Sequence, residues 1–178
     1  MRRFPFVARW IATVAVVWIY PLLLAQGPPG PISSELTKFI TPADNPGSDA
    51  MARLGDQLFD DKRLSADNTV ACNTCHEPRG GFTARAETAK GIRDQSGKRN
   101  TPTIINAAFF QTQFWDGRAA TLEEQAKMPI LNPIEMGMKS PEEVVAKLRA
   151  IPEYVTAFND VFGRPPNYDD MARAIAGV

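Results

Sequence analysis

The sequence is poor in the residues that build metal and redox sites, with one histidine and two cysteines among 178 residues. Both cysteines fall in one short motif, so none is left for a structural disulfide. A zinc site needs four ligands, and the chain has no further Cys or His to supply them. Charge of one sign is not in excess either, because 20 basic residues face 20 acidic ones. Nothing therefore indicates a nucleic acid or an acidic membrane surface as a partner.

What the chain does contain is the run Cys72-Asn73-Thr74-Cys75-His76. C-x-x-C-H is the attachment sequence for a c-type haem, in which two cysteine thioethers hold the porphyrin and the histidine binds the iron. The spacing predicts a short helix that turns both sulfurs and the imidazole to one side. A thioredoxin-like redox pair is the main rival, but it would not need His76, and no βαβ pattern surrounds the motif. Because His76 is the only histidine, any sixth iron ligand must be another residue type or be absent.

The N-terminus resembles an export signal. Three arginines in the first nine residues precede an apolar run from Trp10 to Ala25, and Ala25 is a plausible cleavage point. Sixteen apolar residues are short for a membrane span of about 20, although Leu23 at the minus-three position leaves an uncleaved N-terminal anchor as the alternative. We expect residues 1–25 to be a signal peptide that sends the protein to the periplasm. Residues 26–47, rich in proline and glycine, read as an extended linker.

Residues 48–178 are expected to form one all-α domain with long loops. Apolar residues at three- and four-residue spacing from Met51 to Phe59, capped by Ser48, predict a first helix. A glycine-containing polar stretch from residue 80 to residue 100 predicts a long loop. No convincing strand or internal repeat is found.

Further helices are expected in the second half of the chain. A capping box at Thr121 opens one that should stop at Pro129, and Ser140 opens another. Residues 154–162 mark a third, and Met171 begins a fourth, which reaches Val178 with no cap. The chain is therefore expected to be a fragment of a longer protein.

Seven segments accompany the C-x-x-C-H run in a specific order: Leu54 to Phe59, Arg63 to Ser65, Gly80 to Thr83, Arg99 to Thr103, Phe114 to Ala119, Glu124 to Ala126 and Asn132 to Met136. This series resembles the N-terminal domain of bacterial di-haem cytochrome c peroxidases and their MauG-like relatives. The resemblance covers about 130 residues. It implies a cytochrome c-like fold and a second haem domain, with its own C-x-x-C-H, that this chain lacks.

The resemblance implies a periplasmic peroxidase that reduces hydrogen peroxide to water. The electrons would come from a small redox protein, either a cytochrome c or a cupredoxin, and a homodimer is left open. One haem c belongs to this chain and a second to the full-length protein. A MauG-like enzyme that oxidises protein side chains is an alternative with the same haem site.

Four residues match functional positions of the family. Gln125 and Glu135 match the two distal-pocket residues, Trp115 matches a tryptophan between the two haems, and Asn100 matches a ligand of a calcium site. Three of the four have a plainer interpretation. Trp115 could be a core aromatic, Gln125 a solvated helix residue and Glu135 a surface glutamate before a turn.

Proton transfer to peroxide gives Glu135 an independent argument. Cleavage of the O–O bond needs a group that moves a proton between the two oxygens, and without a second histidine a carboxylate is the best candidate. The neighbours Ile134, Met136 and Met138 predict an apolar setting that would raise the pKa of Glu135.

One position departs from the family pattern. Many of these peroxidases carry a distal histidine in the glycine-rich loop, and here that position is Ile92, after Gly91. Isoleucine has no donor atom, so the haem is expected to be open in its oxidised form. The competing function is a plain electron carrier with His/Met ligation, for which Met128, Met136 and Met138 lie 52 to 62 residues after His76.

Overall fold

The computed structural model describes residue 42 and residues 45–178. The expected signal peptide or anchor and most of the expected linker lie outside these residues. Among the helices in the described part, none is long and apolar enough to cross a membrane.

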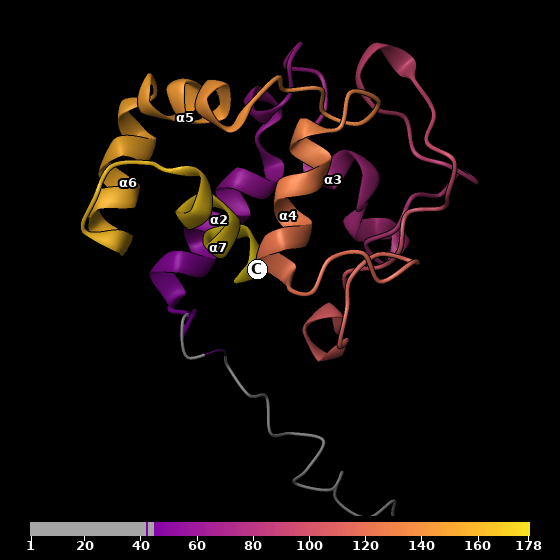
Figure 1. Cartoon of the computed structure of the whole chain (residues 1–178), viewed down its shortest axis with the longest axis horizontal. Coiled ribbons are helices and arrows are strands. Elements are labelled where there is room, and N and C mark those ends of the chain that lie inside the picture. Colours follow the sequence, from indigo (N-terminus) through magenta and orange to yellow (C-terminus); the bar gives the residue numbers. More distant parts are fainter. Residues whose placement is uncertain (1–41, 43–44) are drawn as a thin grey trace, which may run out of the picture. The chain divides into compact units, whose positions relative to one another are not determined.

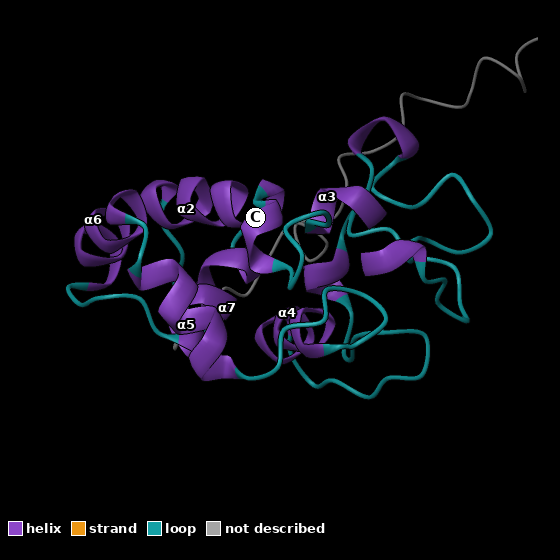
Figure 2. Ribbon diagram, turned by 90° about the horizontal axis from the view of Figure 1, so that it is seen from above, coloured by secondary structure: helices purple, strands orange, loops and turns teal. Residues whose placement is uncertain are grey.

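The described residues are helical, which confirms the all-α prediction. Their β structure is limited to two isolated bridges, Lys90 with Ser96 and Gln113 with Ala119. The helices are α2 (Asp49–Asp60), α3 (Cys72–Cys75), α4 (Leu122–Leu131), α5 (Pro141–Arg149), α6 (Pro152–Phe162) and α7 (Tyr168–Ala176). Short 3-10 turns lie at Lys62–Leu64, Pro78–Gly80, Ile92–Asp94 and Ala107–Phe109. Figures 1 and 2 show α2, α5, α6 and α7 together on one side and the long loops on the other, with α4 between them.

The predicted helix starts are confirmed at α2, α4 and α5. The hydroxyls of Ser48, Thr121 and Ser140 each accept a hydrogen bond from the backbone N–H three residues later. These bonds satisfy amides that have no partner inside the helix. Asn167 caps α7 in the same way.

Two predicted helix ends are wrong. Pro129 lies inside α4, which continues to Leu131. The proline has no N–H for the helix, but the carbonyls of Pro129 and Ile130 accept hydrogen bonds from Met136 and Met138 in the following turn, which hold the end of α4. The last helix does not run uncapped to Val178. It ends at Ala176, and the N–H of Gly177 donates to the carbonyl of Ala174.

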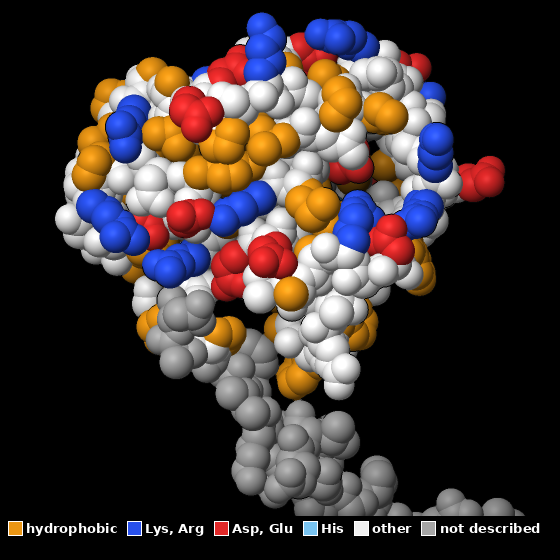
Figure 3. All heavy atoms as spheres, viewed as in Figure 1, with side chains coloured by type: hydrophobic (Ala, Val, Ile, Leu, Met, Phe, Trp, Pro, Cys, Tyr) orange, Lys and Arg blue, Asp and Glu red, His pale blue; other side chains and the backbone are white. Residues whose placement is uncertain are grey.

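The core forms where α2 crosses α7, and α4 and α6 complete it. Gly55 of α2 makes the crossing possible, because a Cβ there would meet the backbone carbonyl group of Ala174. Leu58, Phe158 and Met171 are fully buried in this core. The face in Figure 3 carries a group of hydrophobic side chains with charges of both signs around it.

The segment that leads to the haem motif is tied to α5 by Lys147. Its ammonium group donates to the carbonyls of Arg63 and Ser65, at 3.1 and 2.7 Å, and to Oδ1 of Asn68 at 3.1 Å. Ser65 is fully buried, and its hydroxyl accepts from the N–H of Val70 at 3.1 Å. The start of the haem motif is thus fixed relative to the helical core.

Candidate functional site

The C-x-x-C-H motif forms the single helical turn α3, as predicted. The N–H of His76 donates to the carbonyl of Cys72 at 2.9 Å, and Thr74 Oγ1 accepts from the N–H of Ala71 at 3.0 Å. Both cysteines are free thiols and half-buried. Burial raises the pKa of Cys72 to about 12 and also raises that of Cys75. The thiols therefore stay protonated at neutral pH.

The orientation and the protonation of the His76 imidazole suit binding of a metal. Its Nδ1 lies 3.1 Å from the carbonyl oxygen of Phe82, which can only accept, so Nδ1 carries the proton and Nε2 keeps its lone pair. Burial lowers the pKa of His76, which favours the neutral ring. A neutral imidazole with a free Nε2 is the form that ligates haem iron.

The carbonyl that orients His76 comes from a strained residue. Phe82 has φ of +57°, a left-handed conformation that is unfavourable for a residue with a side chain. Two hydroxyls hold this segment against the Arg99-to-Thr103 segment. Thr103 Oγ1 donates to the carbonyl of Gly81 at 2.6 Å, and Thr83 Oγ1 donates to the carbonyl of Thr101. This pairing explains physically why both segments accompany the haem motif.

Glu135 lies in the turn after α4, in a pocket of about 370 Å³ that Arg118, Met128 and Asn132 also line. The amide nitrogen of Asn132 donates to Oε1 of Glu135 at 2.8 Å. Oδ1 of the same amide accepts from the N–H of Ile134 at 3.0 Å, which fixes the amide orientation. The carboxylate of Glu135 is therefore held in one direction.

Burial raises the pKa of Glu135, although the charge of Arg118 and the hydrogen bond from Asn132 oppose this shift. The direction agrees with the prediction, but the apolar neighbours differ from the expected ones. Met136 and Met138 are buried in the helical core, whereas Met128, Pro129 and Leu131 line the pocket beside Glu135 together with Arg118 and Asn132. The charge of Glu135 also raises the pKa of Cys75. The carboxylate thus lies near the haem motif.

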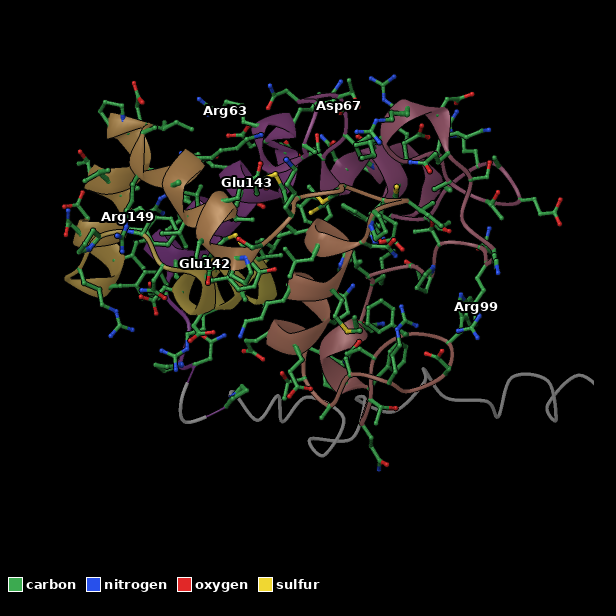
Figure 4. The ribbon with its side chains drawn as sticks, turned by 45° about the horizontal axis from the view of Figure 1, so that its top comes forward. Arg63, Asp67, Arg99, Glu142, Glu143 and Arg149 are labelled. Atoms are coloured by element: carbon green, nitrogen blue, oxygen red, sulfur yellow. The ribbon has the colours of Figure 1, made fainter. Side chains whose placement is uncertain are left out.

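Arg118 is a member of this site that the sequence did not identify. Its guanidinium lies 3.4 Å from the ring centroid of Phe114 and 2.8 Å from Oδ1 of Asp116. Hydrogen bonds from Arg99 and Arg118 lower the pKa of Asp116 to about 2. Figure 4 shows Arg99 on the loop side, away from Arg149 of α5. The sequence did offer a signal for Arg118, because this residue lies in the Phe114-to-Ala119 segment that resembles the family.

The other predicted site residues are only partly brought together. Gln125 is half-buried on α4, two turns before Asn132, and does not line the pocket beside Glu135. Trp115 is 66% exposed, so the core-aromatic interpretation is wrong. Its indole N–H donates to the backbone carbonyl of Asn100 at 2.8 Å. Trp115, which matches the tryptophan between the two haems, and Asn100, the predicted calcium residue, are therefore in direct contact.

Asn100 uses its side-chain nitrogen locally, donating to the carbonyls of Ala86 and Glu87 at 3.2 Å each. The amide oxygen faces the other way, as a calcium ligand would require. In the part of the chain that the structure describes, no group of three His, Cys, Asp or Glu residues is arranged to hold a metal. Calcium at Asn100 stays a prediction.

Met128 is the only one of the three proposed methionine ligands that lines the pocket. It is 40% exposed, whereas Met136 and Met138 are 3% and 2% exposed. Side chains that protein atoms already bury cannot also offer a sulfur atom to an iron. The electron-carrier hypothesis therefore depends on Met128 alone.

The residues present fit a haem c. Two half-buried free thiols and an imidazole whose Nδ1 is held by the carbonyl of Phe82 come from one helical turn, and the charge of the held Glu135 carboxylate acts on Cys75. An all-helical domain with this arrangement defines a cytochrome c-type haem protein.

Comparison with known proteins specifies the class further. The sequence model of the family described as di-haem cytochrome c peroxidase matches residues 49–177, and the chain belongs to that family. It is 44% identical over 148 residues to the cytochrome c551 peroxidase of Pseudomonas aeruginosa, covering 82% of this chain and 42% of the relative. To the methylamine utilization protein MauG of Paracoccus denitrificans it is 41% identical over 148 residues, covering 72% of this chain and 38% of the relative.

A solved structure shares the fold. The crystal structure of a MauG-like protein associated with microbial copper homeostasis is 31% identical, with a TM-score of 0.72, and the match covers 85% of this chain and 45% of that chain. This similarity confirms the predicted cytochrome c-like fold. The chain spans less than half the length of these relatives.

Proposed function

We propose that this chain is the peroxide-reducing domain of a periplasmic peroxidase that converts hydrogen peroxide to water. The observation that carries the proposal is the Glu135 carboxylate. It is half-buried and held by Asn132 in a pocket near the haem motif. The curated relatives named cytochrome c551 peroxidase and cytochrome c peroxidase support the same activity.

The chemistry divides between the cofactor and the chain. Haem c, attached to Cys72 and Cys75 and ligated by His76, would supply an iron for peroxide and the route for electrons. Reduction of one peroxide to two waters consumes two electrons and two protons. Glu135 takes the proton from one peroxide oxygen and gives it to the other, which leaves as water. A pKa raised by burial lets the same carboxyl group accept and release that proton.

The finer parts of the proposal concern the whole protein. A second haem domain receives electrons from a cytochrome c or a cupredoxin, and Trp115 passes them to this domain. The indole of Trp115 is exposed and hydrogen-bonded to Asn100, which supports a role for both residues at the boundary with the second domain. Calcium binds at Asn100. The N-terminal signal directs the protein to the periplasm, where a homodimer forms.

A MauG-like oxidation of protein side chains is the second candidate. The exposure of Trp115 and the 41% identity to MauG favour it, since an indole at the surface can exchange electrons with a bound protein. The two candidates share the haem site and differ in the electron source. Steady oxidation of a reduced cytochrome c or cupredoxin by peroxide identifies the peroxidase.

Replacement of Glu135 tests the proposal. In the haem-loaded chain, Glu135→Gln should slow the reaction with peroxide by roughly 10²–10⁴-fold, the scale for a positioned acid–base group. Stopped-flow absorbance measures this rate, and Glu153→Gln, on the exposed face of α6, is the matched control. Near-normal peroxide kinetics in Glu135→Gln would refute the acid–base role.

The ferric spectrum separates the peroxidase from the electron carrier. A peroxidase domain should be high-spin and should bind cyanide without prior reduction. Ligation by Met128 would instead produce a low-spin spectrum with a methionine–iron charge-transfer band. That band, and its loss in Met128→Leu, would replace the peroxidase proposal with the carrier.

A further inference from the structure

The turn from Lys90 to Ser96 lies directly on the segment that carries Glu135. The N–H of Ile92 donates to the backbone carbonyl of Glu135 at 2.8 Å, and Nε2 of Gln95 donates to the carbonyl of Pro133 at 3.1 Å. The N–H of Gly91 closes the turn by donating to the carbonyl of Gln95 at 2.8 Å. Two hydrogen bonds therefore dock this turn on the Glu135 segment.

The contact is backbone to backbone, which only glycine allows. A Cβ on Gly91 would lie 2.7 Å from Cα of Glu135 and 2.6 Å from its carbonyl oxygen, and it would overlap the carbonyl oxygen of Ile134. Real Cβ atoms do not approach other atoms so closely. Gly91 thus sets how near the turn comes to Glu135.

The side chain of Ile92 completes the contact. It is 2% exposed and belongs to the helical core cluster. Gly137, with φ of +70°, leaves the space that Ile92 fills, since a Cβ there would overlap Cδ1 of Ile92 and lie 3.3 Å from its Cγ1. Ile92 and Gly137 therefore fit each other, and Ile92 is not among the residues that line the pocket.

The docked turn is also strained. Arg93 and Asp94 are consecutive non-glycine residues with φ of +54° and +58°, a left-handed conformation that side chains disfavour. Such strain persists only where surrounding contacts hold it. The buried Ile92 side chain and the bonds from Ile92 and Gln95 hold it from the Glu135 side, and within the turn the ammonium group of Lys90 donates to the carbonyl of Asp94 at 3.3 Å.

From this arrangement we infer that Ile92 is a positioning residue that holds the backbone of Glu135, and so keeps its carboxylate in the pocket. The inference rests on the proposed acid–base role of Glu135. Ile92 contacts the backbone of Glu135, while Asn132 holds its carboxylate.

The test uses the haem-loaded full chain with Ile92→Ala, and Ile92→Val as the milder variant should the first fail to fold. Leu148→Ala is the matched control, since Leu148 is equally buried but lies on α5. Ile92→Ala should increase amide hydrogen exchange across residues 132–138 and slow the peroxide reaction by roughly tenfold to a hundredfold, as small misplacements of catalytic groups do. Leu148→Ala should change neither.

A double-mutant cycle separates positioning from general destabilisation. If Ile92 acts through Glu135, Ile92→Ala should have no further effect on the peroxide rate in a Glu135→Gln background. An effect of full size in that background, or an equal loss of rate in Leu148→Ala, would overturn the inference and leave the role of Glu135 intact. Normal peroxide kinetics in Glu135→Gln alone would overturn both.

Discussion

At the residue scale, the protonation of Glu135 is set by opposing effects. Burial raises its pKa, while the guanidinium of Arg118 and the amide of Asn132 favour the charged form. Arg118 and Asn132 are therefore the two side chains through which the acidity of Glu135 can be altered.

Asn132→Asp should move the pH dependence of the peroxide reaction. The aspartate keeps an oxygen for the N–H of Ile134 but replaces a donor to Glu135 with a negative charge. The pKa of Glu135 should rise further, so the acidic limb of the pH–rate profile should shift to higher pH. A hydrogen bond to a charged group is worth about 1.5–3 kcal/mol, enough for a clear decrease in rate at neutral pH.

The measurement is the pH profile of the peroxide rate by stopped flow. Asn159→Asp, on the exposed face of α6, is the control and should leave the profile in place. An unchanged acidic limb in Asn132→Asp would mean that Asn132 only caps the turn and does not act on the carboxylate.

At the element scale, the crossing of α2 and α7 depends on the absence of one side chain. A Cβ on Gly55 would lie 2.5 Å from Cγ2 of Val178 and 2.9 Å from the carbonyl carbon of Ala174. Packed backbones relax little around an extra methyl group. The two helices would have to separate, and the core that they share with α4 would open.

Gly55→Ala should therefore lower the free energy of unfolding by about 1–3 kcal/mol, the usual cost of overpacking a core. Gly97→Ala is the matched control, because the nearest atom to a Cβ there is the carbonyl oxygen of Arg99 at 4.0 Å. Chemical denaturation of both variants measures the difference. Equal stability of Gly55→Ala and the wild type would show that α2 and α7 do not cross at this residue.

At the scale of the whole molecule, covalent attachment distinguishes a c-type haem protein from one that only binds haem. Cys72 and Cys75 are free and half-buried on one helical turn. Haem should stay with the polypeptide after denaturation and acid–acetone extraction of protein matured in the periplasm. Cys72→Ala/Cys75→Ala should release it. Complete extraction from the wild type would contradict thioether attachment.

The charge and size of the molecule have separate consequences. Equal numbers of acidic and basic residues leave this chain without a strong net field. The chain spans 42% of one peroxidase relative and 38% of MauG. Tests of the chemistry at the His76 site therefore suit this chain.

The sequence by itself determined the features that are local in the chain. The C-x-x-C-H turn, the helix starts at Ser48, Thr121 and Ser140, and the long loop all depend on neighbouring residues, and they were predicted. Pro129 was misread because the hydrogen bonds that hold the end of α4 come from Met136 and Met138 in the following turn, and the local pattern around the proline does not show them.

Only the tertiary structure decided which distant residues share the site. The exposure of Trp115, the burial of Met136 and Met138, and the place of Arg118 beside Glu135 follow from packing between segments far apart in sequence. The same holds for Ile92. The sequence showed that this position lacks a donor atom for the iron, but its contact with the Glu135 segment depends on the close approach at Gly91 and on the space that Gly137 leaves. Burial and close approach depend on how segments pack, and local sequence patterns do not specify that.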